Sequence, residues 1–234
     1  MSAELPMQRV AAVTGGSGAI GGSIAQNLRA SGHTVELLDL NADSPVNLAQ
    51  QGEVQAAAAR LLERHGRIDV LVHAAAAFDQ ANLAELKLDT WRNVQAVNVE
   101  AALWLAQAFV PGMTQNRFGR IVFVVSDTVW DPPAEELLPY VASKAALIGV
   151  ARSLARALGK DGITVNCVAP GLTRTPAAQA GMPEAAFEAV RARMAIDRDL
   201  LPSDIAAAVG FLSSDAAGAL TGQTLCADGG LVLR

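Results

Sequence analysis

Hydrophobic positions along the chain fall into two alternating patterns. Continuous apolar runs of strand length occur at residues 9–14, 34–40, 68–74, 120–126, 163–169 and 223–227. Segments with a helical period lie between them, at 19–31, 52–65, 91–116, 139–160 and 203–212. Continuous apolar strands separated by helices are typical of a parallel sheet that is covered on both faces. The pattern predicts a doubly wound α/β fold in one domain over residues 1–234.

Two stretches interrupt this alternation. Only ten residues separate Asp39, at the end of the second apolar run, from the helical segment that begins near Gln50. This length is too short for a full helix and a strand, so we expect a loop with a minimal strand at 45–48. The second stretch, 171–202, contains glycine, proline and one short segment of helical period at 183–194. We expect it to form a lid over a ligand site.

Composition narrows the range of functions. The chain is 51% hydrophobic and 18% charged, with a net charge of −5, as in an ordinary folded globule. It has no block of lysines and arginines, so we do not expect nucleic acid as a partner. Residues 1–10 have no basic start and no long apolar run, and no later stretch has about 18 uninterrupted apolar residues. We therefore expect a cytoplasmic protein without a membrane segment.

The cysteines do not indicate special chemistry. Cys167 and Cys226 are the only two, and each lies in an apolar, strand-like run. We interpret both as small core side chains without a redox role. The sequence predicts no metal site.

A glycine-rich turn follows the first apolar run and opens the first helix. It reads VTGGSGAIGG over residues 13–22, and Asp39 lies 18 positions after Gly21. Glycines permit a tight turn close to a pyrophosphate, and the helix N-terminus supplies free N–H groups for the anion. Such a turn also serves ordinary chain reversal. Its place between strand and helix, together with the spacing to Asp39, matches a dinucleotide-binding site of the Rossmann type.

Asp39 predicts which dinucleotide binds. An aspartate at this position accepts hydrogen bonds from both ribose hydroxyls and repels a 2′-phosphate. No arginine or lysine adjoins it. The sequence therefore predicts NAD(H) rather than NADP(H).

The only tyrosine of the chain, Tyr140, precedes one of only three lysines, Lys144, by four positions. The apolar positions that follow keep a helical period, so both side chains lie on one face of a helix. A phenol with an ordinary pKa of about 10 is a poor base at neutral pH, and a neighbouring ammonium favours the phenolate. We predict that the pair does acid–base chemistry, and the alternative is a structural pair on the surface.

Two further polar residues are candidates for the same site. Ser126 ends the fourth apolar run, at the carboxyl edge where open α/β sheets bind ligands. Its hydroxyl there can hold a substrate oxygen beside the phenol, whereas a serine that stood alone would simply close a strand. Asn98 lies inside a long predicted helix, either as a buried polar residue with local partners or as part of a proton path.

With these residues in view, the chain resembles the short-chain dehydrogenase/reductase family over essentially its whole length. The motifs that match are TGGSGAIG (14–21), Asp39, IDVLVHAAA (68–76), VNVEAA (97–102), GRIVFVVS (119–126), YVASK (140–144), VNCVAPGLTRT (165–175) and LTGQTLCADGG (220–230). Together these motifs are highly specific. The resemblance implies a Rossmann-like fold and an oxidoreductase.

The resemblance also implies an active-site tetrad of Asn98, Ser126, Tyr140 and Lys144. Tyr140 would exchange a proton with the substrate oxygen, and Ser126 would orient that oxygen. Lys144 would bind the nicotinamide ribose and lower the pKa of the tyrosine. Asn98 would hold a water that extends the proton relay.

Contacts to the cofactor follow from the same resemblance. Besides Tyr140 and Lys144, the implied residues are Gly15, Ser17, Gly18, Ile20 and Gly21 in the turn, Asp39 at the ribose, Asn47, Leu48 and Ala74 on the adenosine side, and Thr173 and Thr175 at the nicotinamide.

Three features depart from the family pattern. Ala19 stands where a glycine is usual, although Gly16, Gly18 and Gly21 still give a literal GxGxxG. The strand end that is usually NNAG reads HAAA at 73–76, so the hydrogen bonds of the asparagine side chains are absent. We expect His73 to be structural and to replace one of them. The shortened segment after Asp39 is expected to leave the adenine pocket more open.

The predicted substrate is a secondary alcohol or ketone, aromatic or alicyclic. We expect the pocket to form from residues 127–139, the lid and Phe78, where Trp130 and the prolines indicate an apolar, rigid wall. The stretch from 108 to the C-terminus is most similar to bacterial aromatic secondary-alcohol dehydrogenases of the 1-phenylethanol dehydrogenase type.

Two alternatives stay open. A 3-oxoacyl-thioester reductase needs a basic patch for acyl carrier protein, for which Arg117, Arg120 and Arg174 are thin support, and Asp39 argues against the usual NADPH. A regulatory protein that binds NAD without turnover need not keep acid–base groups, so the Tyr, Lys and Ser set speaks against it. The resemblance also implies a homotetramer built through the helices at 91–116 and 139–160.

Overall fold

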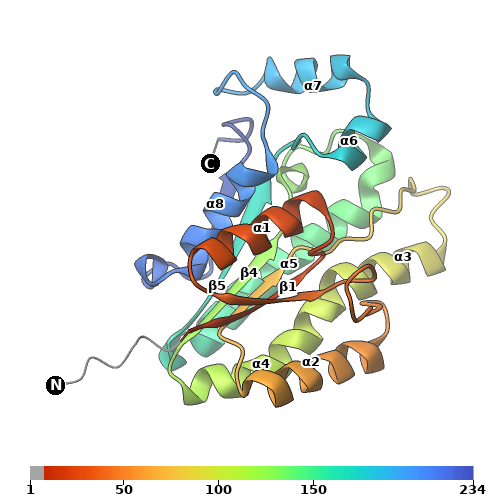
Figure 1. Cartoon of the computed structure of the whole chain (residues 1–234). Helices are drawn as coiled ribbons and strands as arrows, with labels where there is room; N and C mark the ends of the chain where they lie inside the picture. Colours follow the sequence, from red (N-terminus) through yellow and green to blue (C-terminus); the bar gives the residue numbers. More distant parts are fainter. Residues whose placement is uncertain (1–7, 234) are drawn as a thin grey trace.

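Six parallel strands form the central sheet of the protein, which a computed structural model describes for residues 8–233. They are β1 (Val10–Thr14), β2 (Thr34–Leu38), β3 (Val70–His73), β4 (Gly119–Val124), β5 (Ile163–Pro170) and β6 (Thr224–Ala227). Their order across the sheet is β2-β1-β3-β4-β5-β6, and Figure 1 labels β1, β4 and β5 in the middle of the molecule. Each of the six apolar runs predicted as a strand forms one, with limits within two residues of the prediction. The outer limits of the predicted domain, residues 1 and 234, lie outside the described residues.

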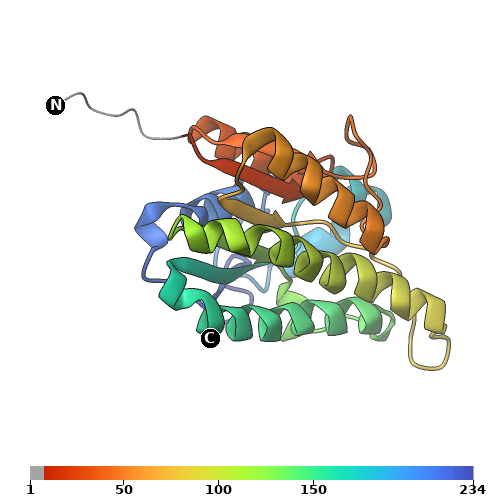
Figure 2. The same ribbon diagram turned by 90° about the horizontal axis from the view of Figure 1, so that it is seen from below.

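Helices cover both faces of the sheet, so the predicted doubly wound α/β fold is confirmed. On one face, α1 (Ala19–Ala30) and α8 (Pro202–Ser213) bury residues four positions apart, Ile24 with Leu28 and Ile205 with Val209. This spacing is that of one helical face. On the other face, α2 (Gln51–His65), α4 (Ala101–Gln115) and α5 (Leu138–Leu158) lie side by side (Figure 2).

The strand order reverses at β1, and this position creates a crevice. Thr14, at the carboxyl end of β1, pairs with Leu38 of β2 on one side and with His73 of β3 on the other. The connections from β1 and β3 leave toward opposite faces of the sheet. Ligands of open α/β sheets bind at such a point, outside the carboxyl ends of the strands.

The long helix predicted at 91–116 is interrupted. It consists of α3 (Leu88–Gln95), a π-helical turn η1 (Ala96–Glu100) and α4. A π turn holds one more residue than a regular turn, and such turns occur frequently at functional sites. Asn98 lies within this turn and is fully buried.

Residues 40–50 form a loop without a strand, so the predicted minimal strand at 45–48 is wrong. Burial holds the loop instead, because Val46 is 2% and Leu48 6% exposed. Val46 N also donates to Asp39 O at 3.0 Å. The predicted lid region contains two short helices, α6 (Pro176–Gly181) and α7 (Glu184–Arg191), at the top of Figure 1.

One helical segment of the described chain, 135–161, is long and apolar enough by length and composition to cross a membrane. It comprises η3 (Glu135–Leu137), α5 and η4 (Gly159–Asp161). In the fold, α5 buries Leu147, Ile148 and Ala151 in the core under the sheet. Core helices pass the same test of length and composition, and a single helix of this kind is weak evidence for a membrane span.

Candidate active site

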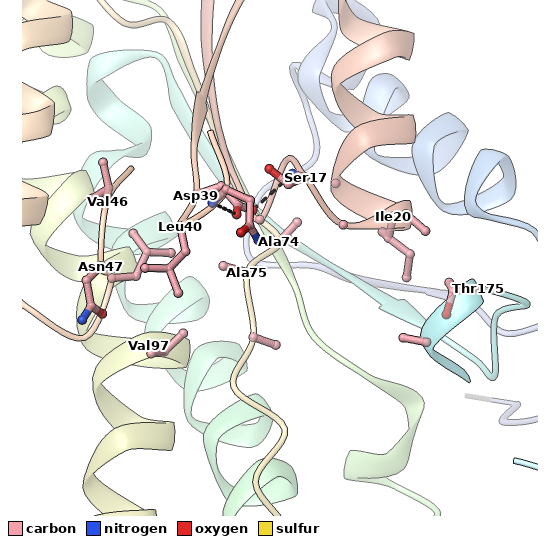
Figure 3. Close-up of a pocket in the computed structure, with 18 of the residues that line it drawn as sticks. Ser17, Ile20, Asp39, Leu40, Val46, Asn47, Ala74, Ala75, Val97 and Thr175 are labelled. Atoms are coloured by element: carbon pink, nitrogen blue, oxygen red, sulfur yellow. Dashed lines mark hydrogen bonds between the residues drawn. The ribbon is translucent and has the colours of Figure 1, made fainter. Parts of the chain in front are cut away.

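A cavity of about 650 Å³ opens at the carboxyl ends of β1, β2 and β3 (Figure 3). Most of the predicted cofactor residues line it: Gly15, Ser17, Gly18, Ile20, Gly21, Asp39, Asn47, Leu48, Ala74 and Thr175. Residues that the sequence did not single out also contribute, namely Ala19, Leu40, Asn41, Val46, Ala75, Ala76, Val97, Pro176 and Ala177. The cavity lies at the predicted dinucleotide site.

Two glycines at the turn between β1 and α1 have no room for a side chain. Gly15 has φ +69°, and a Cβ there would lie 2.7 Å from Ala75 Cα. A Cβ on Gly21 would lie 2.1 Å from Gly15 O. Ala19, where the family has glycine, is tolerated because its side chain is exposed at the start of α1. No side chain caps α1, so the first N–H groups of the helix are available to an anion.

The Asp39 carboxylate is held at the edge of the cavity. It accepts hydrogen bonds from Ser17 N at 3.1 Å and Asn41 N at 2.9 Å (Figure 3). Among the described residues that line the cavity, none is arginine or lysine. The carboxylate therefore places a negative charge beside the glycine turn without a basic neighbour in the wall.

The two threonines of the loop after β5 differ in position. Thr175 lines the cavity, and its Oγ1 accepts from Ala178 N at 3.1 Å, which caps α6. Thr173 is only 5% exposed and is absent from the described lining. Its hydroxyl donates to Gly171 O at 2.9 Å. The structure thus does not bring Thr173 to the cavity, because its side chain is bonded within its own turn.

Tyr140 and Lys144 lie on one face of α5, as predicted. Lys144 is 2% exposed, and its Nζ lies 5.4 Å from the centroid of the Tyr140 ring. Nζ donates to Val124 O at 2.8 Å. The alternative of a surface pair is therefore wrong. The Phe78 ring packs edge-on against Tyr140, with centroids 4.7 Å apart.

Burial dominates the acid–base properties of this pair. It raises the pKa of Tyr140 to about 12, against a hydrogen bond from Ser126 that lowers it. It lowers the pKa of Lys144 to about 8. The predicted lowering of the tyrosine pKa is not found: loss of solvation raises this pKa, and Lys144 is not among the groups that shift it. The phenol of Tyr140 is therefore protonated at neutral pH.

Ser126 follows β4 and precedes the short helix η2 (Asp127–Val129). It is 7% exposed. Its Oγ accepts from Thr128 N at 3.3 Å and from Thr128 Oγ1 at 2.9 Å. Its Oγ also lies 3.3 Å from Asp127 Oδ1. Sequence analysis included Asp127 in the pocket segment 127–139 but gave it no role beside Ser126, although the acid next to Ser126 in VVSD was a visible signal.

The Asn98 side chain has local partners, as one of the two predicted roles requires. Its Oδ1 accepts from Ala77 N at 2.7 Å, and its Nδ2 donates to Ala77 O at 3.1 Å and Ser143 Oγ at 2.9 Å. Ser143 Oγ in turn donates to Tyr140 O at 2.7 Å. Asn98 thus joins the end of β3 to the helix that carries Tyr140.

His73 replaces part of the missing asparagine hydrogen bonding. Thr14 Oγ1 accepts from Ala74 N and Ala75 N, both at 3.1 Å, so its own proton goes to His73 Nδ1 at 3.0 Å. His73 Nε2 therefore carries the ring proton and donates to Asn98 O at 3.1 Å. Burial lowers the pKa of His73 to about 3. The ring is neutral and structural, as we expected.

The described residues 8–233 contain no group of three or more His, Cys, Asp or Glu side chains placed to hold a metal ion. Cys167 is buried in the core and Cys226 packs against it, and neither forms a disulfide. Burial raises the pKa of Cys167 to about 12, which keeps it an inert thiol.

Comparison with known proteins identifies the family. A family model described as enoyl-(acyl carrier protein) reductase matches residues 15–232. The 3-oxoacyl-[acyl-carrier-protein] reductase FabG of Thermotoga maritima is 34% identical, covering 80% of this chain and 76% of its own. The D-threitol dehydrogenase of Mycolicibacterium smegmatis is 31% identical, covering 97% and 94%. The chain belongs to the short-chain dehydrogenase/reductase family.

Three further proteins are similar to this short-chain dehydrogenase/reductase over nearly its full length. The (2S)-[(R)-hydroxy(phenyl)methyl]succinyl-CoA dehydrogenase subunit BbsD of Thauera aromatica is 31% identical, covering 95% of this chain and 96% of its own. The solved TT0495 protein of Thermus thermophilus has a TM-score of 0.88 at 34% identity, covering 96% and 99%. YwfH, an NADPH-dependent reductase of bacilysin biosynthesis, shares the fold with a TM-score of 0.87 at 23% identity, covering 97% and 99%.

Membership in this family makes the protein an oxidoreductase that uses a nicotinamide cofactor. The residues present fit such a cofactor. The glycine turn leaves the space that a Cβ would fill, the uncapped start of α1 suits a pyrophosphate, and the Asp39 carboxylate lines the same cavity.

Proposed function

We propose that this short-chain dehydrogenase/reductase transfers a hydride between NAD(H) and a secondary alcohol or ketone that carries an aromatic or alicyclic group. One observation carries the proposal: Lys144 is buried beneath the Tyr140 ring, and Ser126, after the carboxyl end of β4, is hydrogen-bonded to the phenol. The glycine-lined cavity opens at the same edge of the sheet, although Tyr140 and Lys144 are not among its described lining residues. A proton donor, an orienting hydroxyl and a cofactor site thus meet at one edge of the sheet.

The nicotinamide supplies or accepts the hydride. In ketone reduction, the protein has to hold the carbonyl oxygen and deliver one proton to it. Ser126 donates a hydrogen bond to that oxygen, and Tyr140 transfers its phenolic proton to it. With its pKa raised to about 12, Tyr140 is protonated at neutral pH and suited to reduction. Lys144 stabilises the phenolate that remains, and Asn98 fixes α5 through Ser143.

Asp39 supports NAD(H) as the cofactor. Its carboxylate is fixed by two backbone N–H groups and can accept hydrogen bonds from ribose hydroxyls. A 2′-phosphate would meet this negative charge in a wall whose described residues include no arginine or lysine. YwfH depends on NADPH, but it is only 23% identical to this chain, and at that distance the likeness concerns the fold alone.

Aromatic side chains support an aromatic or alicyclic substrate of the 1-phenylethanol type. Phe78 is 54% exposed and stands edge-on to Tyr140, so it offers a ring face beside the reacting oxygen. Trp130, in the loop after Ser126, is partly buried against the core. Among the relatives, BbsD is named as a dehydrogenase of a compound with a hydroxy(phenyl)methyl group. A flat, apolar group fits such walls.

The 3-oxoacyl-thioester reductase remains the second candidate, because FabG is among the relatives. Two of the three arginines that would attract an acidic carrier protein are engaged elsewhere. Arg120 is 5% exposed and donates to Ser214 O and Gly119 O. Arg174 pairs with Glu184 and Asp199. Both features favour a small, free substrate over a carrier-bound one.

We also propose a cytoplasmic homotetramer, assembled through α3 with α4 and through α5. Long helices on one face of the sheet offer self-complementary surfaces for such an assembly. Mass measurement in solution, by light scattering after size-exclusion chromatography, tests it. A monomeric mass would contradict this proposal without affecting the catalytic one.

The decisive experiment compares oxidation of NADH and NADPH with a panel of aryl ketones and 3-oxoacyl thioesters, for the wild type and Tyr140→Phe. We expect NADH-dependent turnover of aryl ketones that falls by at least about a thousandfold in Tyr140→Phe, because the phenylalanine keeps the ring and removes the proton. Preference for thioesters or NADPH would overturn the substrate or cofactor assignment. Tight binding of NADH without turnover of any carbonyl would indicate a sensor.

A further inference from the structure

Asp127 is an acid that the proposed reaction does not require, yet it lies directly beside Ser126. It is the first residue of η2 and is 6% exposed. Its Oδ1 lies 3.3 Å from Ser126 Oγ. A carboxyl group is costly to bury, so its position next to the residue that holds the substrate oxygen needs an explanation.

The hydrogen bonds of Ser126 determine where its single proton points. A serine hydroxyl has one proton and two lone pairs. Thr128 donates to Ser126 Oγ twice, from its backbone N and from its Oγ1. The proton of Ser126 is therefore left for an acceptor. Asp127 Oδ1, at 3.3 Å, is one within reach, and the phenol oxygen of Tyr140, to which Ser126 is also hydrogen-bonded, is the other. During ketone reduction, that same proton has to point to the substrate oxygen. Asp127 and the substrate compete for it.

We propose that Asp127 is a positioning residue whose protonation state sets the direction of the Ser126 hydroxyl. When Asp127 is ionised, it holds the Ser126 proton. When Asp127 is protonated, it donates its own proton to Ser126 Oγ in place of the Thr128 hydroxyl, which is free to rotate, and the Ser126 proton turns to the substrate oxygen. The inference rests on the proposed function, in which Ser126 binds that oxygen.

Burial and nearby acids bring the pKa of Asp127 into the pH range where its ionised and protonated forms are both populated. Burial first, then the charge of Asp228, raise its pKa to about 6, and Asp131 adds to this. Bonds from Ser126 and Thr128 N act in the opposite direction. Asp228 lies after β6 and is 2% exposed, with Gly230 N and Val232 N as donors to its carboxylate.

Positive charges near Asp127 are engaged by other groups. Arg193, from the lid, pairs with Asp131. On the α5 side, Lys144 Nζ donates to Val124 O. The negative charge of Asp127 raises the pKa of Tyr140. Ionisation of Asp127 therefore acts on both groups that handle the substrate oxygen.

Asp127→Asn provides the kinetic test, because an asparagine amide always donates and so mimics the protonated acid. In the wild type, we expect kcat for ketone reduction to fall at least about tenfold between about pH 5 and 8. In Asp127→Asn, we expect it to change by less than about threefold over the same range. Asp131→Asn is the matched control. It removes a nearby acid, and we expect its kcat for ketone reduction still to fall with rising pH.

A second readout does not need turnover. The chain has one tyrosine, so carbon-13 at its Cζ gives a single NMR resonance. In the wild type this resonance should shift with a midpoint near pH 6, where Asp127 titrates, and in Asp127→Asn this shift should be absent. Persistence of the shift in Asp127→Asn, or its absence in the wild type, overturns the inference whether or not a ketone is turned over.

Two further outcomes complete the test. If the shift behaves as expected but the pH dependence of kcat is unchanged in Asp127→Asn, then Asp127 titrates without directing Ser126, and the proposal is wrong. If the wild type reduces no carbonyl at all, the proposed function fails instead, while the resonance still reports on Asp127. Should Asp127→Asn fold poorly, Asp127→Ala serves for the NMR measurement.

Discussion

The glycine turn at the cofactor cavity packs against backbone, whereas segment 171–202, the predicted lid, is held by ion pairs between side chains. At the glycine turn, Gly15 and Gly21 have no space for even a Cβ. At the lid, Arg174 pairs with both Glu184 and Asp199, and further ion pairs join Arg191 to Asp199 and Arg193 to Asp131.

The difference has a physical consequence for each side. Backbone contacts at van der Waals distance have one geometry and do not respond to salt or to small changes in pH. Partly exposed ion pairs are weak individually and are screened by salt. We infer that the cofactor side is rigid and intolerant of substitution, while the lid tolerates exchange and can open at little cost.

The largest effect is expected from Gly21→Ala. Its Cβ would lie 2.1 Å from Gly15 O, so the turn has to open by enough to disturb the pyrophosphate site. We expect affinity for NADH to fall at least about a hundredfold, as measured by calorimetry. Gly52→Ala is the control, because a Cβ at that helical position meets nothing within 4 Å. Unchanged affinity in Gly21→Ala would contradict the rigid cradle.

A smaller effect is expected from Asp39→Asn, which removes the charge and keeps a carbonyl oxygen for the N–H of Ser17. The ratio of kcat/KM for NADH over that for NADPH should fall about tenfold to a hundredfold. Asp43→Asn, in the same loop but outside the cavity lining, should leave the ratio unchanged. A ratio that stays constant in Asp39→Asn would show that the carboxylate does not face the 2′ position.

The hydrogen bonds of His73 join Thr14, at the end of β1, to Asn98 in the π turn, and they predict a dependence of stability on pH. The pKa of His73 is about 3 in the fold and 6.5 ordinarily, so the unfolded chain takes up the proton first. This contribution to stability is present above about pH 6.5 and is lost as pH falls toward about 3. The loss is about 1.4 kcal/mol per pH unit, or about 2 kcal/mol by pH 5.

The measurement is the free energy of unfolding in urea at several pH values, for the wild type and His73→Asn. The difference between the two proteins should shrink on acidification, because only the wild type has the buried imidazole. Parallel curves from pH 7 to about pH 4 would refute the assignment of a neutral, buried His73.

The smallest effect is expected at the lid. Arg174→Gln removes the ion pairs to Glu184 and Asp199 and a contact of the guanidinium with the Phe187 ring. We expect KM for the ketone to rise about twofold to fivefold, and high salt should raise the KM of the wild type toward the same value. Arg64→Gln, which removes a pair with Glu36 remote from the lid, should have no effect on KM. A change in kcat alone would argue against a lid function.

The elements of the fold were predictable because burial leaves a strong pattern. The strands are continuous apolar runs, and every one of them lies in the sheet. The glycine turn and Asp39 were predictable because β1 and β2 are adjacent parallel strands. The residue that follows β2 therefore lies beside the turn that follows β1. Tyr140 and Lys144 were brought together by helical period alone.

Other parts of the site depended on properties that sequence does not display. Thr173 and Thr175 lie two positions apart in an irregular loop, and only the conformation of that loop decides which one faces the cavity. The pKa of Tyr140 depends on the depth of its burial, which periodicity does not measure. The π turn arises from one additional residue in an otherwise regular helix, and that residue has no characteristic composition.

The π turn at Ala96–Glu100 can be viewed as an insertion that the protein has retained. Deleting one residue from it would restore a regular α-helix, whose hydrogen bonds are better formed. The part of the helix before the deletion would then rotate by roughly 100° relative to α4. Asn98 would turn away from Ala77 and Ser143, the partners that it now contacts. A regular helix without the additional residue would thus separate the end of β3 from α5, which carries Tyr140. This predicts that deleting a residue from the π turn is tolerated less well than substituting one.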